Sequence, residues 1–151
     1  MDDNLAFLFT DMARSMRREF DARARHIGVT RPQWRMLTAL VRREGSNQGQ
    51  LADHLEVEPI TLARMVDRLQ EAGLVERRPD PADRRAWLLY LTPKARPIVE
   101  RLQALGETMF TEAVDGISAT EIEQVRRTVQ TMRANMARHY SLCRQKDAAN
   151  G

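Results

Sequence analysis

The stretch that decides the fold spans residues 48–91 and reads QGQLADHLEVEPITLARMVDRLQEAGLVERRPDPADRRAWLLYL. Its first half predicts a short helix over about 48–55, a tight turn at Glu56-Val57-Glu58 and a second helix over about 59–72, which Gly73 ends. A short helix, a short turn and a second helix are typical of a helix-turn-helix, whose second helix enters the major groove of DNA.

The period of the sequence changes after Gly73. Residues 74–78 are half apolar and extended, residues 79–83 are dense in Pro and Asp, and residues 86–91 are aromatic and apolar. We therefore expect a β-hairpin that carries Arg84 and Arg85 at its tip. A hairpin directly after a helix-turn-helix forms a wing, so the predicted fold is mainly α with a small β-hairpin wing.

The helix over 59–72 is predicted to have an inner and an outer face. Its inner face carries Ile60, Ala63, Val66 and Leu69, and its outer face carries Thr61, Leu62, Arg64, Met65 and Arg68. Arg64 lies in the half of the helix that reaches base edges, whereas Arg68 pairs with Asp67 or Glu71 or touches a phosphate. In the wing, Asp83 is expected to hold the guanidinium of Arg84 or Arg85, and Arg is favoured in a narrow minor groove.

Helices are predicted on both sides of this module. An apolar stripe over 5–27, from Leu5 to Ile27, ends at Gly28, and Thr30 begins a helix over about 31–43. Thr92, followed by Pro93, is predicted to cap a helix that runs to about residue 114. The spacing Ser118-x-x-Glu121 predicts a capping box for a last helix that ends near residue 142.

The terminal helices carry more apolar surface than one chain of this length needs. We expect residues 1–30 and 93–142 to form a helical dimerisation domain, residues 31–92 the winged helix-turn-helix DNA-binding domain, and residues 143–151 a flexible tail. A monomeric helical subdomain is the alternative.

Basic side chains are concentrated in and after the predicted wing. The chain has 151 residues, a net charge of +3 and 24 Lys and Arg residues, of which Lys94 and Lys146 alone are lysine. Residues 77–101 hold seven basic and three acidic side chains. Genomic codon bias is an alternative origin for the choice of Arg. The local clustering indicates a polyanionic partner, and the planar Arg fork suits phosphate and guanine.

Other function classes find little support. The one cysteine, Cys143, excludes an intramolecular disulfide, and the three histidines, His26, His54 and His139, lack the spacing of metal ligands. The sequence has no phosphate-binding glycine loop and no nucleophile elbow, so we expect neither an enzyme nor a cofactor nor a metal site. The acidic start Met1-Asp2-Asp3-Asn4 is unlike a secretory signal and no apolar run suits a membrane span, which predicts a cytoplasmic protein.

The chain resembles the MarR family of bacterial transcriptional regulators, in particular its SlyA-like branch, over about residues 5–142. The resemblance is carried by Gln50-Leu51-Ala52-x-x-Leu55-x-Val57, by Thr61-Leu62-x-Arg64-x-Val66-x-x-Leu69, by Gly73-Leu74-Val75-x-Arg77, and by Asp83-Arg84-Arg85 with Leu91-Thr92-Pro93-Lys94-Ala95. The resemblance implies a two-fold dimer that binds palindromic DNA and either represses genes or displaces other DNA-binding proteins. It also implies that the dimer releases DNA when it binds small aromatic acids.

The resemblance also implies site residues. Arg64 corresponds to a contact of the recognition helix, Arg84 and Arg85 to wing-tip contacts oriented by Asp83, and Ile60 and Thr61 to contacts with a base methyl and a phosphate. Trp34, with Arg14 and Arg17, matches positions that line the effector pocket, and Met65 is a further candidate for that cavity. The family's peroxide sensors carry a reactive Cys in the first helix; this chain has none there, so we do not expect thiol sensing.

Two alternatives from other classes remain open at this point. A non-specific architectural DNA-binding protein without an effector predicts steep salt dependence and little sequence preference. A protein-interaction module that has lost DNA binding is opposed by the intact Arg64, Arg84 and Arg85. Trp34 is also an ordinary core anchor, and Arg14 and Arg17 an ordinary solvated face.

Overall fold

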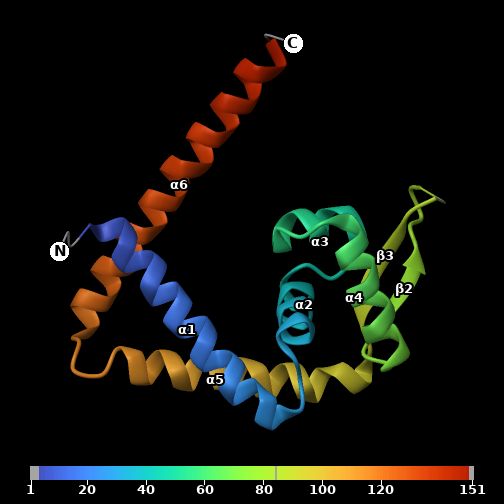
Figure 1. The fold of residues 1–151 in the computed structure, drawn as a ribbon, viewed down its shortest axis with the longest axis horizontal. Coiled ribbons are helices and arrows are strands. Elements are labelled where there is room, and N and C mark those ends of the chain that lie inside the picture. The colour runs from blue at the N-terminus through green and yellow to red at the C-terminus, as the bar shows by residue number, and fades with distance from the viewer. Residues whose placement is uncertain (1–3, 84, 150–151) are drawn as a thin grey trace. The chain divides into compact units, whose positions relative to one another are not determined.

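The computed structural model describes residues 4–83 and 85–149, and the side chains of these residues up to residue 139. The helices are α1 (Leu5–Ile27), α2 (Arg31–Arg42), α3 (Gln48–Leu55), α4 (Pro59–Glu71), α5 (Arg96–Ala113) and α6 (Ala119–Ala149) (Figure 1). The strands are β1 (Ser46–Asn47), β2 (Val75–Pro79) and β3 (Trp87–Leu91), and a short 3-10 turn, Pro93–Ala95, precedes α5. The predicted class, mainly α with a small β wing, is confirmed.

The sheet has one strand more than the sequence predicted. Its order is β1-β3-β2 and both pairings are antiparallel, with Pro79 opposite Trp87 and Ser46 opposite Leu89. The extra strand, β1, has two residues, which are too few to show the alternation that predicts a strand. They pair only because the chain passes along β3, where the N–H of Gly45 donates to the carbonyl of Leu89 at 2.9 Å.

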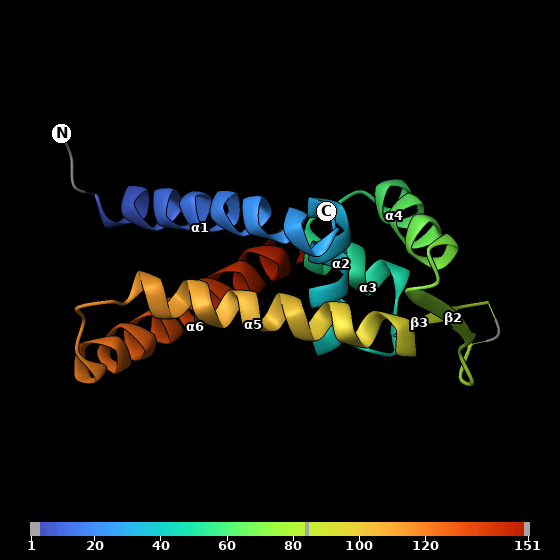
Figure 2. The ribbon, with the colours of Figure 1, turned by 90° about the horizontal axis from the view of Figure 1, so that it is seen from below.

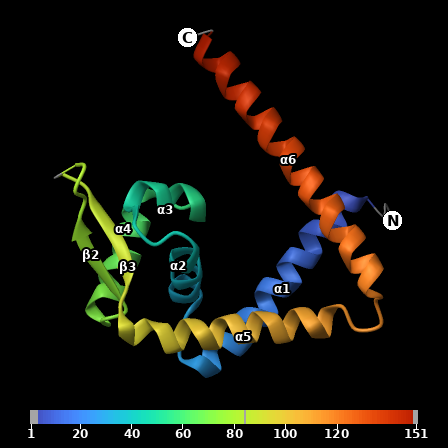
Figure 3. The same cartoon turned by 180° about the vertical axis from the view of Figure 1, so that it is seen from behind.

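The core joins the helix-turn-helix to the sheet within the first of two compact units, and the boundary between the units in the sequence lies between Met109 and Phe110. Figure 3 shows α2, α3 and α4 grouped beside the β2–β3 ribbon. Leu37 and Leu40 of α2 are fully buried together with side chains from α3, α4 and β3, namely Leu51, Leu62, Val66 and Leu89. Burial of such side chains stabilises by roughly 1.5–3 kcal/mol each, which fixes α4 relative to the sheet.

The apolar stripe of α1 is only partly used inside the chain. Ala24, near the C-terminal end of α1, is buried, and Phe20 and Ile27 pack against the core. The remaining members of the stripe are exposed, namely Leu5, Leu8, Phe9, Met12 and Met16. Helix α6, in the second unit, likewise exposes Val125, Val129, Met132 and Met136.

Most predicted helix ends are confirmed. Gly28 follows α1 in the left-handed region with φ 89°, as a terminating glycine does. The N–H of Thr30 donates to the Gln33 side chain at 2.9 Å, and the N–H of Ser118 donates to Glu121 at 3.0 Å, which completes both predicted capping boxes.

Two ends differ from the sequence prediction. Thr92 stands at the N-cap position as predicted, but the helix there is a 3-10 turn that leads into α5, and the Thr92 hydroxyl makes no capping bond because it donates to the carbonyl of Gly73 at 2.7 Å. Helix α6 continues to Ala149, past residue 142, where the sequence placed its end. The flexibility of residues 143–151 stays a prediction.

The faces of α4 are rotated from those predicted. Leu62, expected on the outer face, is fully buried, and Ile60, expected on the inner face, is 64% exposed. Leu62, Val66 and Leu69 follow steps of four and three and face the core. Apolar residues occur on several sides of this helix, so its periodicity is ambiguous and its packing against α2 and α3 decides the rotation.

Candidate nucleic-acid interface

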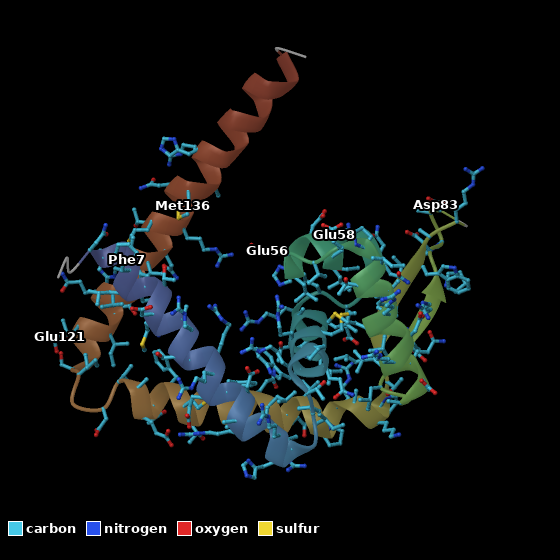
Figure 4. All side chains as sticks on the ribbon, viewed as in Figure 1. Phe7, Glu56, Glu58, Asp83, Glu121 and Met136 are labelled. Carbon is cyan, nitrogen blue, oxygen red and sulfur yellow. The ribbon has the colours of Figure 1, made fainter. Side chains whose placement is uncertain are left out.

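Helix α4 is fixed at its start by the turn that joins it to α3. Glu56 ends α3 in the left-handed region with φ 52°, and the N–H of Val57 donates to the carbonyl of Ala52 at 3.1 Å. The backbone carbonyl of Glu58 then accepts the N–H groups of Thr61 and Leu62 at 2.9 and 3.0 Å. Figure 4 labels Glu56 and Glu58 at this turn. The start of α4 is therefore held by main-chain bonds, which leaves the carboxylate of Glu58 without a capping role.

Four of the predicted contact residues lie on the solvent side of α4. Ile60, Thr61, Arg64 and Arg68 are exposed. Among the described residues, the guanidinium groups of Arg64 and Arg68 have no ion pair or hydrogen bond. Cations held on a helix with no internal partner are available to phosphate oxygens and base edges.

Asp67 does not pair with Arg68, as had been one expectation. It accepts a hydrogen bond from Arg77 of β2 at 2.5 Å, and Arg77 also bonds to the side chain of Gln70. The Arg77 side chain is 22% exposed. It connects the exposed half of α4 to the wing and neutralises an acidic group that would otherwise repel DNA.

The wing turn is ordered by its aspartates. Asp80 accepts the N–H of Ala82 at 2.8 Å, and Asp83 accepts the N–H of Arg85 at 2.9 Å. Among the described residues Asp83 bonds to the main chain of Arg85 and not to its guanidinium, so the expectation that it holds a guanidinium stays a prediction for Arg84. Such aspartate–backbone bonds fix a turn locally. Arg84 lies outside the described residues.

Cations remain available on the wing after these bonds are made. The Arg85 side chain is exposed and has no hydrogen bond or ion pair in the described residues. Arg78 differs, because it pairs with Glu76 and lies over the ring of Tyr90, 4.3 Å from its centroid. Figure 2 shows β2 and β3 projecting as a ribbon from the helices.

Among the described residues, no hydrogen bond or ion pair joins the predicted effector-binding residues to one another. Trp34 is half-buried; its Nε1–H donates to Asp21 at 2.8 Å, and its ring lies 4.6 Å from that of Phe20 between centroids. Arg14 forms an exposed pair with Asp11 at 3.7 Å, and Arg17 is exposed. Met65 is half-buried against the core. The polar neighbour of Trp34 is thus a carboxylate of α1, which sequence reasoning missed.

Asp21 links α1 to the start of α2. It accepts a hydrogen bond from Nε of Arg31 at 2.5 Å as well as the one from Trp34. The hydrogen bond from Arg31 lowers the pKa of Asp21 below its ordinary value, against the opposing effect of desolvation. The lowered pKa favours the ionised carboxylate, which anchors both Trp34 and Arg31 of α2 to α1.

The described residues contain no group of three or more His, Cys, Asp and Glu side chains arranged to hold a metal ion. No helix in the described part of the chain is both long and apolar enough to cross a membrane.

Comparison with known proteins points to one family. A model described as MarR family matches residues 27–86. The crystal structure of the transcriptional regulator PA3341 is 32% identical in sequence with a TM-score of 0.79, and the match covers 88% of this chain and 98% of that one. A MarR-family regulator from Silicibacter pomeroyi is 28% identical with a TM-score of 0.76, covering 87% and 89%. Wild-type MarR from E. coli is 25% identical with a TM-score of 0.76, covering 87% and 98%.

Proposed function

The chain belongs to the MarR family of transcriptional regulators, and from this premise we propose that it acts as a dimeric repressor of pseudo-palindromic operators. The observation that supports this most is a pair of cations that have no partner among the described residues, Arg64 on α4 and Arg85 on the wing; they lie on the two elements that a winged module presents to DNA. Regulators of this kind are generally not enzymes, and the motifs quoted above favour the SlyA-like branch.

The contacts divide into base readout and positioning. Arg64 is assigned to a base edge, because it is exposed in the N-terminal half of α4 and a guanidinium pairs bidentately with guanine. Ile60 is assigned to a thymine methyl group, and Thr61 and Arg68 to phosphates. On the wing, Arg85 and Arg84 are assigned to the minor groove, and Asp83 keeps its turn in shape.

Two copies are required for the proposed operator symmetry. The exposed stripe of α1 and the exposed apolar side chains of α6 support a dimer formed by the terminal helices. Exposed apolar surface of this extent in one chain favours a protein–protein interface. A closed two-fold dimer places two copies of α4 on half-sites about one helical turn apart.

A small aromatic carboxylate is proposed as the effector that releases the operator. The half-buried ring of Trp34 would form an apolar wall against the ligand's ring, and Met65 would form an adaptable wall. The exposed Arg14 and Arg17 would pair with the ligand's carboxylate. Such a ligand regulates only if it binds the DNA-incompetent arrangement better. Salicylate at millimolar concentration is expected to weaken operator binding, and an unchanged affinity would contradict this part of the proposal.

The deciding experiment is selection of binding sites from a random duplex pool with the full chain. We expect a pseudo-palindrome to be enriched. Arg64→Ala should then cost ~1–3 kcal/mol on the selected site and relax the preference at one position per half-site. Arg101→Ala is the matched control, since it removes an equal charge from an exposed position on α5.

Two results would contradict sequence-specific regulation. One is steep salt dependence with no enriched sequence, which is the behaviour of an architectural protein. The other is an equal loss on selected and random DNA for Arg64→Ala, which would confine Arg64 to the phosphate backbone.

A further inference from the structure

Trp87 stands out on the wing because it is a large aromatic side chain that the fold leaves uncovered. It is 49% exposed, although it lies in β3 directly opposite Pro79 of β2. In the described residues its indole N–H has no hydrogen-bond acceptor. The N–H of a buried tryptophan normally has a hydrogen-bond partner inside the protein. The N–H of Trp87 has none among the described residues and is therefore available to a ligand.

The pleat of the sheet decides which way Trp87 faces. Side chains two residues apart point to the same face of a strand, so Trp87 shares a face with Leu89 and Leu91, both of which are buried. Opposite them on β2, Arg77 and Pro79 share that face through the observed register. The Pro79–Trp87 pair therefore continues the inner face of the sheet beyond the edge of the core.

This inner face is the one turned toward α4. Arg77 belongs to it and reaches Asp67 and Gln70 of α4. From Arg77 to Pro79 the strand advances about 7 Å. The Pro79–Trp87 pair lies one step further along this face, toward the wing turn, where β2 and β3 project from the helices (Figure 2).

We propose that Trp87, supported by Pro79, is a contact for the DNA backbone where the backbone passes the wing. The indole face packs against a deoxyribose and the Nε1–H donates to a phosphate oxygen. Charge complementarity supports this occupant over a protein surface, because the exposed Arg85 lies two residues before Trp87 on the wing, while the carboxylate of Asp67 is already bound by Arg77. The proposal rests on the DNA-binding function proposed above and adds a residue that sequence reasoning did not assign.

Fluorescence tests the contact directly, because the chain has two tryptophans. In the full chain carrying Trp34→Phe, Trp87 is the sole emitter, and saturating duplex DNA should lower its acrylamide quenching constant. In the reciprocal variant, Trp87→Phe, the remaining Trp34 is half-buried against Phe20 and should keep its quenching constant. An unchanged quenching constant for Trp87 at saturating DNA overturns the proposal.

Affinity gives a second, independent readout. Trp87→Ala should weaken binding by about 3- to 10-fold, by the same factor on random and on selected duplex, since one hydrogen bond and its packing are lost. Trp87→Phe, which keeps a ring but not the donor, should fall between. Leu88→Ala, on the opposite face of β3, is the control and should leave affinity unchanged.

Two further outcomes would contradict the proposal. A loss of affinity in Trp87→Ala that is confined to the selected sequence would exclude a contact with the DNA backbone. A lower molecular mass of the DNA-free Trp87→Ala variant would assign this surface to a second copy of the chain. The random-duplex measurements need no operator. Failure to enrich any sequence would therefore overturn the proposed regulation and leave the Trp87 contact testable.

Discussion

At the scale of single residues, Glu56 holds an unfavourable backbone conformation. Its φ of 52° lies in the left-handed region, where it ends α3 and sets the turn into α4. A residue with a side chain pays roughly 1–2 kcal/mol for this conformation, whereas glycine adopts it freely. Part of the stability that glycine would gain is lost again, because the unfolded chain has more conformational freedom at a glycine. Glu56→Gly should raise the free energy of unfolding in urea by about 0.5–1 kcal/mol. The control is Glu58→Gly, at φ −61°, which should give no gain; equal shifts for both variants would contradict the conformational argument.

Asp21 makes a pH-dependent contribution. The hydrogen bond from Arg31 lowers the pKa of the Asp21 carboxyl in the folded protein below its value in the unfolded chain. The stabilisation is therefore complete at pH values above the pKa in the unfolded chain, and it is lost as the pH falls through the pKa in the folded protein. Asp21→Asn should lower the free energy of unfolding by about 1–2 kcal/mol at pH 7, and the difference should shrink below about pH 4. Urea titrations at both pH values measure this. Asp11→Asn, in the exposed pair with Arg14, should change little at either pH; a deficit for Asp21→Asn that persists undiminished at pH 3 would refute the ionic explanation.

At the scale of elements, one side chain fastens the recognition helix to the wing. Arg77 of β2 bonds to Asp67 and Gln70 of α4, so both DNA-facing elements keep one spacing. Arg77→Ala should lower the free energy of unfolding by about 1 kcal/mol and weaken binding to the selected site. Arg78→Ala is matched in charge, but its ion pair stays within β2, so its effect on stability should be smaller. Identical losses of stability and affinity in the two variants would mean that charge alone matters.

At the scale of the whole molecule, the exposed apolar stripe of α1 predicts self-association. We expect light scattering to give the mass of a dimer, and the double variant Leu8→Glu with Met12→Glu to give a monomer that binds the operator weakly, because charges on this face oppose its burial. Phe7→Glu is the matched control: Phe7 is 65% exposed on the same helix and lies outside the stripe, at about 100° per residue (Figure 4). Dissociation of the control, or a stable dimer of the double variant, would exclude the stripe as the interface.

Helix ends and the wing follow from local chemistry, and the sequence by itself determined them. Gly28 terminates α1 and the pairs Thr30–Gln33 and Ser118–Glu121 begin helices, because each rule needs only residues a few positions apart. The Pro- and Asp-rich turn between two apolar runs was enough to predict the antiparallel β2–β3 pair. The order of helix, turn, helix and hairpin was enough to predict the winged fold.

Only the tertiary structure decided the features that depend on what packs against an element. The rotation of α4 exchanged the expected places of Ile60 and Leu62, since docking on α2 and α3 chooses one of several apolar faces. Asp67 meets Arg77 rather than Arg68, and Trp34 meets Asp21, because these partners are distant in sequence and come together through the core. The sheet's pleat and register likewise place the uncovered Trp87 on the face turned toward α4. Side-chain partners across elements depend on the packing of the whole unit, which no local pattern encodes.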